Sequence, residues 1–409
     1  MKKSPVTLLQ EIQEQPGLLQ ALVDNSNALF STLQYPKKNV THLVAIAEGS
    51  SKNALEIAAP FIETWTGLPL SVYDPESLEE RFAVTDLIKV PSQPTSPAFL
   101  QNAHYIVVSQ SGETASVLSV LDTIEARISI SAQTQVGLSK TLSMVAITNN
   151  SDSTLAKRYG NILALGTGVE RSIAATKTMT ASLMLLLLWG LHAGHASSRI
   201  STEAFEAIRQ TLAQAPQCLG SLWEETARKQ TIRFTRKLME VNHFVLLSKG
   251  PLVKILPEAG LKLTETSSNI VYTDNAESFK HGPKVMLSGV NGAHPNTLYI
   301  VPRHKETAAG LFKDLRAHFW INPFQENEAL AFENDRVFFI RFENSPPVPD
   351  SVYEGLSLKK ENILLLPPSG GVFDSLFLAL VAFQLISYEL AILKGEDPNN
   401  PALEKAVTD

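Results

Sequence analysis

One short stretch, Ser109-Gln110-Ser111-Gly112-Glu113-Thr114, most constrains what this chain can fold into. The apolar run Tyr105–Val108 precedes it and an amphipathic segment begins near Ala115, which is the order of a strand, a tight polar turn and a helix. The first N–H groups of a helix have no intrahelical acceptor and carry partial positive charge, so hydroxyls and a glycine at this place suit a phosphate. One hydroxyl would be explained by N-capping alone, whereas three within six positions favour anion binding. The stretch predicts a phosphate site at a strand–helix junction.

A second junction of the same kind precedes it in the chain. The buried-strand pattern His42–Ala47 ends in Glu48-Gly49-Ser50-Ser51, and a helical pattern follows from Ala54 to Trp65. Ordinary N-capping is again the alternative. Two hydroxyl-rich turns at the carboxyl ends of strands fit the crevice where open parallel sheets bind ligands, so we expect both turns in one site.

The rest of the chain repeats strands and helices in two related halves. Further strands are predicted at Leu70–Tyr73, Met144–Asn150, Ile162–Leu165, His243–Leu247, Leu298–Val301, Arg336–Phe342 and Ile363–Leu366. Further helices are predicted at Met179–Leu191, Lys254–Thr266 and Phe373–Leu393. This order predicts an α/β fold with parallel sheets and an internal duplication.

The pattern divides the chain into five parts. They are a helical arm (1–34), a first α/β domain with the phosphate turn (35–198), a helical connector (199–235), a second α/β domain (236–396) and a tail (397–409). In the arm, helical spacing from Leu8 to Leu22 is interrupted at Gln15-Pro16-Gly17. The helix from Met179 is so apolar that we expect it to be buried between domains or subunits.

Composition excludes several classes of function. The net charge of −6, without a basic stripe, argues against nucleic acid as a partner. The single Cys218 excludes an internal disulfide and fits a reducing compartment. No signal peptide is visible, and the longest apolar run, Leu183–Leu191, is too short to span a membrane, so we expect a soluble cytoplasmic protein.

No cofactor is expected from the motifs. The chain has no Walker-type loop and no G-x-G-x-x-G fingerprint. His192 and His195 have the i, i+3 spacing of a metal pair, but no glutamate or third ligand lies nearby in sequence, so a structural role is favoured. We therefore expect that neither a nucleotide nor a metal is required.

Several motifs fall in the order seen in one family. They are Leu9–Pro16, Gly49-Ser50-Ser51, Ser109–Thr114, Glu170 through Thr176-Lys177, Glu258 with Lys262 and Glu265, Lys280-His281-Gly282-Pro283, and Lys405–Thr408. Over nearly its whole length the chain resembles the isomerase half of glucosamine-6-phosphate synthase, which is built from two sugar isomerase (SIS) domains. It is similar also to the stand-alone amino-sugar-phosphate deaminases and isomerases.

The resemblance implies a substrate site. It implies that Ser109, Gln110, Ser111 and Thr114 hold the sugar phosphate, helped by Ser50 or Ser51, which agrees with the helix-end argument. It also implies that Glu170 and Ala175 contribute to substrate binding.

The resemblance implies catalytic residues in the second half. Glu265 matches the family's catalytic glutamate, which moves a proton between C1 and C2, and Lys262 is expected to face the same substrate. Spacing alone favours a routine surface ion pair for Lys262 and Glu265. His281 is expected to exchange protons during ring opening in the active site of a neighbouring subunit, which implies a homodimer. The alternative is an ordinary loop histidine.

The tail resembles the family segment whose lysine forms a Schiff base with the open-chain ketose, and Lys405 matches that lysine. The segment is one residue shorter here and lacks the family's arginine, and a solvated charge is the alternative. Pro257 is expected to kink or start the helix that carries Glu265. The segment Tyr272–Glu277 differs from the synthase, so substrate specificity stays open.

The preferred function is conversion of glucosamine 6-phosphate to fructose 6-phosphate with release of ammonia. No glutaminase domain precedes Met1 and no N-terminal cysteine is present, so we expect that the chain cannot itself take ammonia from glutamine. Alternatives are deglycation of fructosamine 6-phosphate and plain aldose–ketose isomerisation. A non-catalytic sugar-phosphate-binding regulator is an alternative of another class, although no helix-turn-helix with a basic face is evident.

Overall fold

The computed structural model describes residues 7–87, 98–134, 142–288, 294–319, 336–356 and 358–399. The chain forms two compact units. The N-terminal unit contains Gly17–Glu170 and Lys177–Gln210, and the described part of the C-terminal unit contains residues 7–16, the short segment Arg171–Thr176 and residues 211–399.

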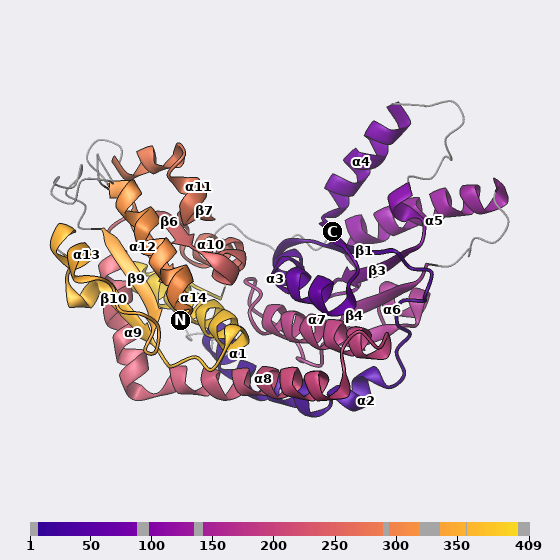
Figure 1. Ribbon diagram of the computed structural model, residues 1–409, viewed down its shortest axis with the longest axis horizontal. Helices are drawn as coiled ribbons and strands as arrows, with labels where there is room; N and C mark the ends of the chain where they lie inside the picture. Colours follow the sequence, from indigo (N-terminus) through magenta and orange to yellow (C-terminus); the bar gives the residue numbers. More distant parts are fainter. Residues whose placement is uncertain are drawn as a thin grey trace. The chain divides into compact units, whose positions relative to one another are not determined.

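The N-terminal unit is a parallel five-stranded sheet in the order β2-β1-β3-β4-β5. Its strands are β1 (His42–Ala47), β2 (Leu70–Tyr73), β3 (Ala103–Val108), β4 (Met144–Thr148) and β5 (Ile162–Ala164). Its main helices are α3 (Gly49–Thr66), α4 (Pro75–Leu87), α5 (Ala115–Thr134), α6 (Thr154–Tyr159) and α7 (Lys177–Ala196). Helices α3 and α7 pack together on one face of this sheet, and α4 and α5 cover the other (Figure 1).

The C-terminal unit repeats this topology with the order β10-β9-β8-β6-β7, again all parallel. Its strands are β6 (His243–Ser248), β7 (Ile270–Asn275), β8 (Asn296–Val301), β9 (Val337–Phe342) and β10 (Ile363–Leu366). Its main helices are α9 (Glu225–Leu238), α10 (Leu256–Ser267), α11 (Ala276–Phe279), α12 (Lys305–Phe319), α13 (Asp350–Gly355) and α14 (Val372–Lys394). Counted within its own half, each sheet has the order 2-1-3-4-5 of flavodoxin-like folds, so the predicted fold class and duplication are confirmed.

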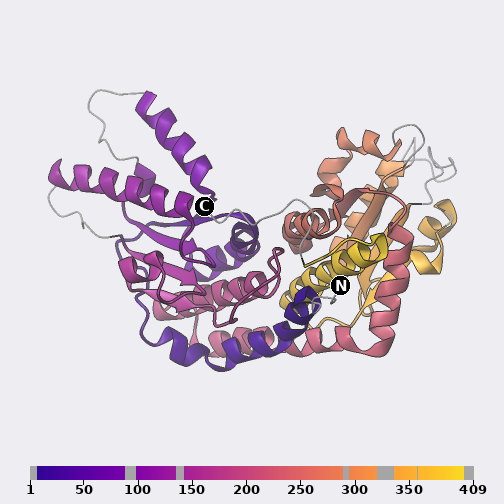
Figure 2. The same cartoon turned by 180° about the vertical axis from the view of Figure 1, so that it is seen from behind.

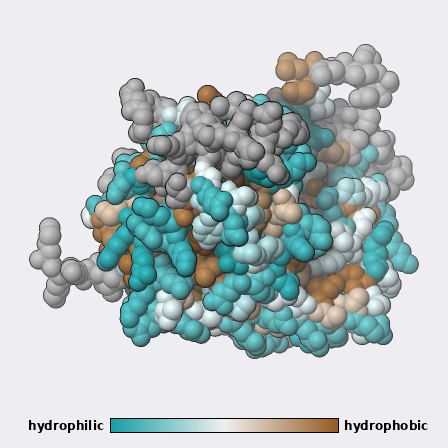
Figure 3. Space-filling model, turned by 60° about the vertical axis from the view of Figure 1, so that its left-hand side comes forward, coloured by the Kyte–Doolittle hydropathy of each residue, from teal (hydrophilic) through white to brown (hydrophobic). Residues whose placement is uncertain are grey.

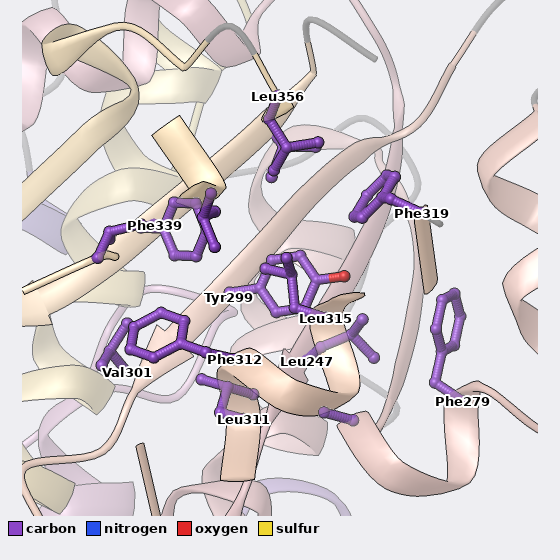
Figure 4. Packing of buried hydrophobic residues seen from close by; sticks show 14 of the residues in the cluster. Leu247, Phe279, Tyr299, Val301, Leu311, Phe312, Leu315, Phe319, Phe339 and Leu356 are labelled. Atoms are coloured by element: carbon purple, nitrogen blue, oxygen red, sulfur yellow. The ribbon is translucent and has the colours of Figure 1, made fainter. Parts of the chain in front are cut away.

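The two faces of the second sheet have separate cores. On one face, side chains from the strands pack against α12, with Tyr299 and Phe339 between Phe312 and Phe319 (Figure 4). On the other face, α10 packs against α14, and α14 packs against α9 (Figure 2). The face of the molecule shown in Figure 3 is mostly hydrophilic, with hydrophobic side chains scattered among polar ones.

Outside the two sheets, α1 (Thr7–Asp24) and α2 (Ser26–Phe30) lie ahead of β1, and α8 (Thr202–Gly220) precedes α9. The predicted interruption of the first helix is wrong, because α1 continues through Pro16. Its apolar face explains this, since Leu8, Ile12 and Leu19 are buried on either side of the proline.

The prediction that no apolar segment is long enough to span a membrane is wrong by length and composition. Two helices, α7 and α14, are long and apolar enough to cross a membrane by length and composition. An unbroken apolar run underestimates them, because single polar residues such as Ser182 in α7 and Gln384 and Ser387 in α14 interrupt the run without ending the helix. In the most apolar window of each helix, 83% of α7 and 89% of α14 is buried, which is the behaviour of central core helices.

Candidate substrate site

The predicted phosphate turn joins β3 to α5. Ser109 is buried, and its hydroxyl lies 2.8 Å from the hydroxyl of Thr114, which closes the turn. The amide of Gly112 donates to Ser109 Oγ at 3.1 Å, and the amide of Glu113 donates to Ser111 Oγ at 3.1 Å. The hydroxyls of Ser109, Ser111 and Thr114 therefore shape the turn.

Only glycine fits the centre of this turn. Gly112 has φ +66°, and a Cβ there would lie 2.2 Å from the hydroxyl of Ser153. Ser153 caps α6 by accepting from the amide of Ala156 at 3.2 Å. The turn is thus packed tightly against the start of a neighbouring helix.

The turn leaves backbone donors available to an anion. Among the described residues, no acceptor is found for the amides of Gln110, Ser111 and Thr114. These groups lie at the N-terminus of α5, where the helix dipole adds positive potential. A phosphate placed there would receive several N–H and O–H hydrogen bonds.

The second predicted turn lies next to the first. Strands β1 and β3 are neighbours, and the chain leaves them toward opposite edges of the sheet, so both turns lie at the switch point where such sheets bind ligands. Ser50 and Ser51 are half-buried in the first turn of α3, after Gly49 at φ +52°. Ser116 of α5 donates to Glu48 at 2.8 Å and joins the two turns. The sequence analysis assigned no role in the site to Glu48 or Ser116, although the position of Glu48 directly after a strand could have indicated one.

Glu170 has a structural task in this unit. Its carboxylate accepts from the amide of Lys177 at 2.8 Å and from the hydroxyl of Thr178, so it caps the N-terminus of α7. Ala175 lies half-buried in Arg171–Thr176, which belongs to the C-terminal unit. There the buried Glu11 accepts from the amide and hydroxyl of Ser172. The substrate roles of Glu170 and Ala175 stay predictions.

In the C-terminal unit, α10 carries the predicted base. Pro257 lies in its first turn and starts the helix. The ammonium of Lys262 lies 3.4 Å from Glu258 Oε1 and 2.5 Å from Glu265 Oε2. Glu258 and Lys262 are buried, whereas 32% of the Glu265 side chain is exposed, so the group is not the routine surface pair that spacing alone favoured. Within the described residues Lys262 is the sole polar partner of Glu265, and its Oε1 is available to a ligand.

The turn with the predicted histidine follows α11. The amide of His281 donates to Ser278 O at 3.0 Å, and its side chain is exposed. Lys280 pairs with Glu277 and Asp314, each at 3.5 Å. Beside this turn, Val285 and Met286 are exposed hydrophobic residues.

The remaining predicted groups have simpler outcomes. Lys405 lies outside the described residues. His192 stacks on Phe30 at 4.4 Å, and His195 stacks on Phe205 at 4.7 Å, which fits the structural role predicted for both. Over the described part of the chain, no three His, Cys, Asp or Glu side chains are grouped to hold a metal.

These features define a class of protein. Two flavodoxin-like sheets in tandem, the first with a hydroxyl-rich turn at its switch point, form the tandem SIS arrangement. The chain is homologous to the C-terminal, isomerising part of glutamine–fructose-6-phosphate aminotransferase. The enzyme of that name from Acinetobacter baylyi is 26% identical over 409 residues, which cover 98% of this chain and 59% of the relative. No model of a known protein family matches the chain.

Solved structures agree on the fold. The C-terminal domain of glucosamine-fructose-6-phosphate aminotransferase from Francisella tularensis has a TM-score of 0.70 at 20% identity, covering 98% of this chain and 99% of that one. Tagatose-6-phosphate ketose/aldose isomerase from Escherichia coli has a TM-score of 0.64 at 19% identity, covering 97% and 95%. Glucosamine-6-phosphate deaminase from Thermotoga maritima has a TM-score of 0.61 at 18% identity, covering 98% of both chains.

Proposed function

We propose that the protein is a sugar-phosphate isomerase that converts glucosamine 6-phosphate and water to fructose 6-phosphate and ammonia. The observation that carries the proposal is the turn Ser109–Thr114 at the switch point of the first sheet, with its cluster of hydroxyls and its available amides. A phosphate ester is the ligand chemistry that such a turn recognises.

Glu265 is the proposed base. It removes the proton from C2 of the open-chain aldose and returns it to C1. The C1 oxygen takes up a proton and the amine gives one up, so that C1 becomes a hydroxymethyl group and C2 carries a carbon–nitrogen double bond. Water then hydrolyses that bond to the ketone and releases ammonia. Lys262 fixes one carboxylate oxygen of Glu265 at 2.5 Å, and the other oxygen is left for the substrate proton. A half-exposed carboxylate oriented by a buried cation suits general base catalysis.

His281, Lys405 and a second subunit complete the proposal. His281 is exposed and suits proton exchange during ring opening, and Lys405 is the proposed amine for the open-chain ketose. A homodimer is the proposed form, because the exposed Val285 and Met286 beside His281 suit a protein contact. The cytoplasm is the proposed location.

The test is a coupled assay that measures fructose 6-phosphate and ammonia from glucosamine 6-phosphate. Glu265→Gln should lower kcat at least about a thousandfold while calorimetry still detects phosphosugar binding. Thr264→Ala on the same helix, which removes only a hydroxyl bonded to Gly260 O, is the matched control and should keep full activity. Turnover by Glu265→Gln at the wild-type rate would remove Glu265 from the base role.

The same assay separates the alternatives. Ketose formation from glucose 6-phosphate without ammonia from glucosamine 6-phosphate would indicate a plain aldose–ketose isomerase. Turnover of fructosamine 6-phosphate alone would indicate a deglycase. Binding of phosphosugars without any turnover would indicate a regulator.

A further inference from the structure

Helix α11 is too short to be stable by itself, yet it leads directly into the turn Lys280–Pro283. Its position therefore depends on tertiary contacts. One face of α12 supplies them through two buried polar residues one turn apart, Asp314 and His318.

His318 joins α11 to the core of the sheet. Its Nε2 lies 2.8 Å from the carbonyl oxygen of Ala276, the first residue of α11, and its Nδ1 lies 2.7 Å from the hydroxyl of Tyr299. A carbonyl only accepts, so Nε2 carries the proton and Nδ1 accepts from Tyr299. The imidazole ring also packs edge-on against Phe279, with centroids 5.1 Å apart. His318 thus contacts both ends of α11 (Figure 4 shows Phe279 and Tyr299).

Asp314 holds the adjoining charged groups. Its carboxylate lies 2.7 Å from the ammonium of Lys249 and 3.5 Å from that of Lys280. Lys249 also reaches Glu277 of α11 at 3.0 Å. Asp314 is 4% exposed, so it is paired in a setting where water competes poorly for these contacts.

We propose that Asp314 and His318 are positioning residues that hold α11 and thereby aim His281 at the substrate. This inference rests on the proposed function. Neither residue touches the substrate; each acts through α11 and Lys280. His318 reaches the first residue of α11 by a hydrogen bond and the last residue by a ring contact, and Asp314 pairs with Lys280 directly after it.

The decisive experiment compares His318→Leu with His318→Gln in the full-length protein. Leucine removes both hydrogen bonds, whereas glutamine offers an N–H to Ala276 and an oxygen to Tyr299. We expect His318→Leu to lower kcat at least tenfold while KM changes less than threefold, because the phosphate turn lies in the other unit. His318→Gln should recover most of that loss, and the exposed Lys313→Ala on the same helix should match wild type.

Hydrogen exchange separates this inference from the proposed function. The amides of residues 276–282 should exchange at least tenfold faster in His318→Leu, with exchange in α10 and α14 unchanged. Should His318→Leu fail to fold, Asp314→Asn gives the same test, with faster exchange around Lys280. Unchanged exchange in residues 276–282 would overturn the inference even if the enzyme is active. If residues 276–282 exchange faster in His318→Leu but the wild-type protein does not turn over glucosamine 6-phosphate, the structural role of His318 stands and the proposed function is refuted.

Discussion

Replacement of Gly112 by alanine tests the geometry of the phosphate turn. The added Cβ would lie 2.2 Å from Ser153 Oγ, 2.5 Å from Ser153 Cβ and 2.9 Å from Thr148 Oγ1, and the backbone has φ +66°. Left-handed backbone costs an L-residue about 1–2 kcal/mol, and overpacking adds about 1–3 kcal/mol. Gly112→Ala should therefore lower the free energy of unfolding by about 2–5 kcal/mol.

Gly160 is a matched control for this change. It has φ +69° at the other end of α6, and a Cβ there would meet no atom within 4 Å. Gly160→Ala should cost only the backbone part, about 1–2 kcal/mol. Urea unfolding of both variants gives the steric part by difference. Adding Ser153→Gly to Gly112→Ala should recover stability, because glycine is tolerated at an N-cap at a cost of about a few tenths of a kcal/mol.

Binding completes this test. The shifted turn should bind fructose 6-phosphate at least about tenfold more weakly, or about 1.4 kcal/mol, by calorimetry below the unfolding transition. Equal stability of Gly112→Ala and Gly160→Ala, without recovery from Ser153→Gly, would refute the steric reasoning. Unchanged affinity in Gly112→Ala would refute the assignment of the phosphate to this turn.

Three further predictions concern ionisable side chains that the fold buries wholly or in part. Burial lowers the pKa of His104 to about 3 and those of His192 and His318 to about 4, so below pH 6.5 the unfolded chain binds more protons than the folded one. The free energy of unfolding should therefore fall as the pH drops from 6.5 to 4, by up to about 1.4 kcal/mol per pH unit for each histidine, and a flat urea-unfolding profile would contradict this. Lys262→Met should destabilise the protein by about 3–5 kcal/mol, well beyond Glu265→Gln, because it removes the cation beside the buried Glu258; equal losses in urea unfolding would contradict the buried triad. Lys394→Met should cost about 1–3 kcal/mol in the same assay, since it loses hydrogen bonds to Ser267 O at 3.0 Å and Asn269 Oδ1 at 2.7 Å; no loss would contradict this.

The fold was predictable from the sequence because strand patterns are local. All the predicted strands are present. One further strand, β7, was not predicted, and its position in the sheet gives the reason. It lies at an edge of the sheet with its side chains half-buried or exposed, and its apolar start Ile270-Val271-Tyr272 gives way at once to Thr-Asp-Asn, so its apolar run is only three residues long. Hydrophobic periodicity reports burial, and an edge strand has little of it.

The candidate site was predictable in part for a different reason. A turn such as Ser109–Thr114 carries its chemistry in adjacent residues, and spacing describes it well. The burial of Lys262 depends on α10 lying between β7 and α14, which helical spacing does not encode. Likewise, Asp314 and His318 show only the i, i+4 spacing common on helix surfaces, and their partners lie far away in the sequence.

The two halves show which features the backbone requires and which the ligand requires. Gly49 after β1 and Gly250 after β6 occupy the same place in their sheets, and both have positive φ, at +52° and +70°. The turns after β3 and β8 have diverged: the first has hydroxyls and Gly112, while the second reads Pro302-Arg303-His304, where proline has no N–H to offer. Of these two turns, the first therefore has a glycine and three hydroxyls, and Pro302-Arg303-His304 has neither. We expect Ser109→Ala to weaken phosphosugar binding, measured by calorimetry, and Arg303→Ala to leave it unchanged. The reverse result would show that the phosphate binds in the second half of the chain and not at the turn Ser109–Thr114.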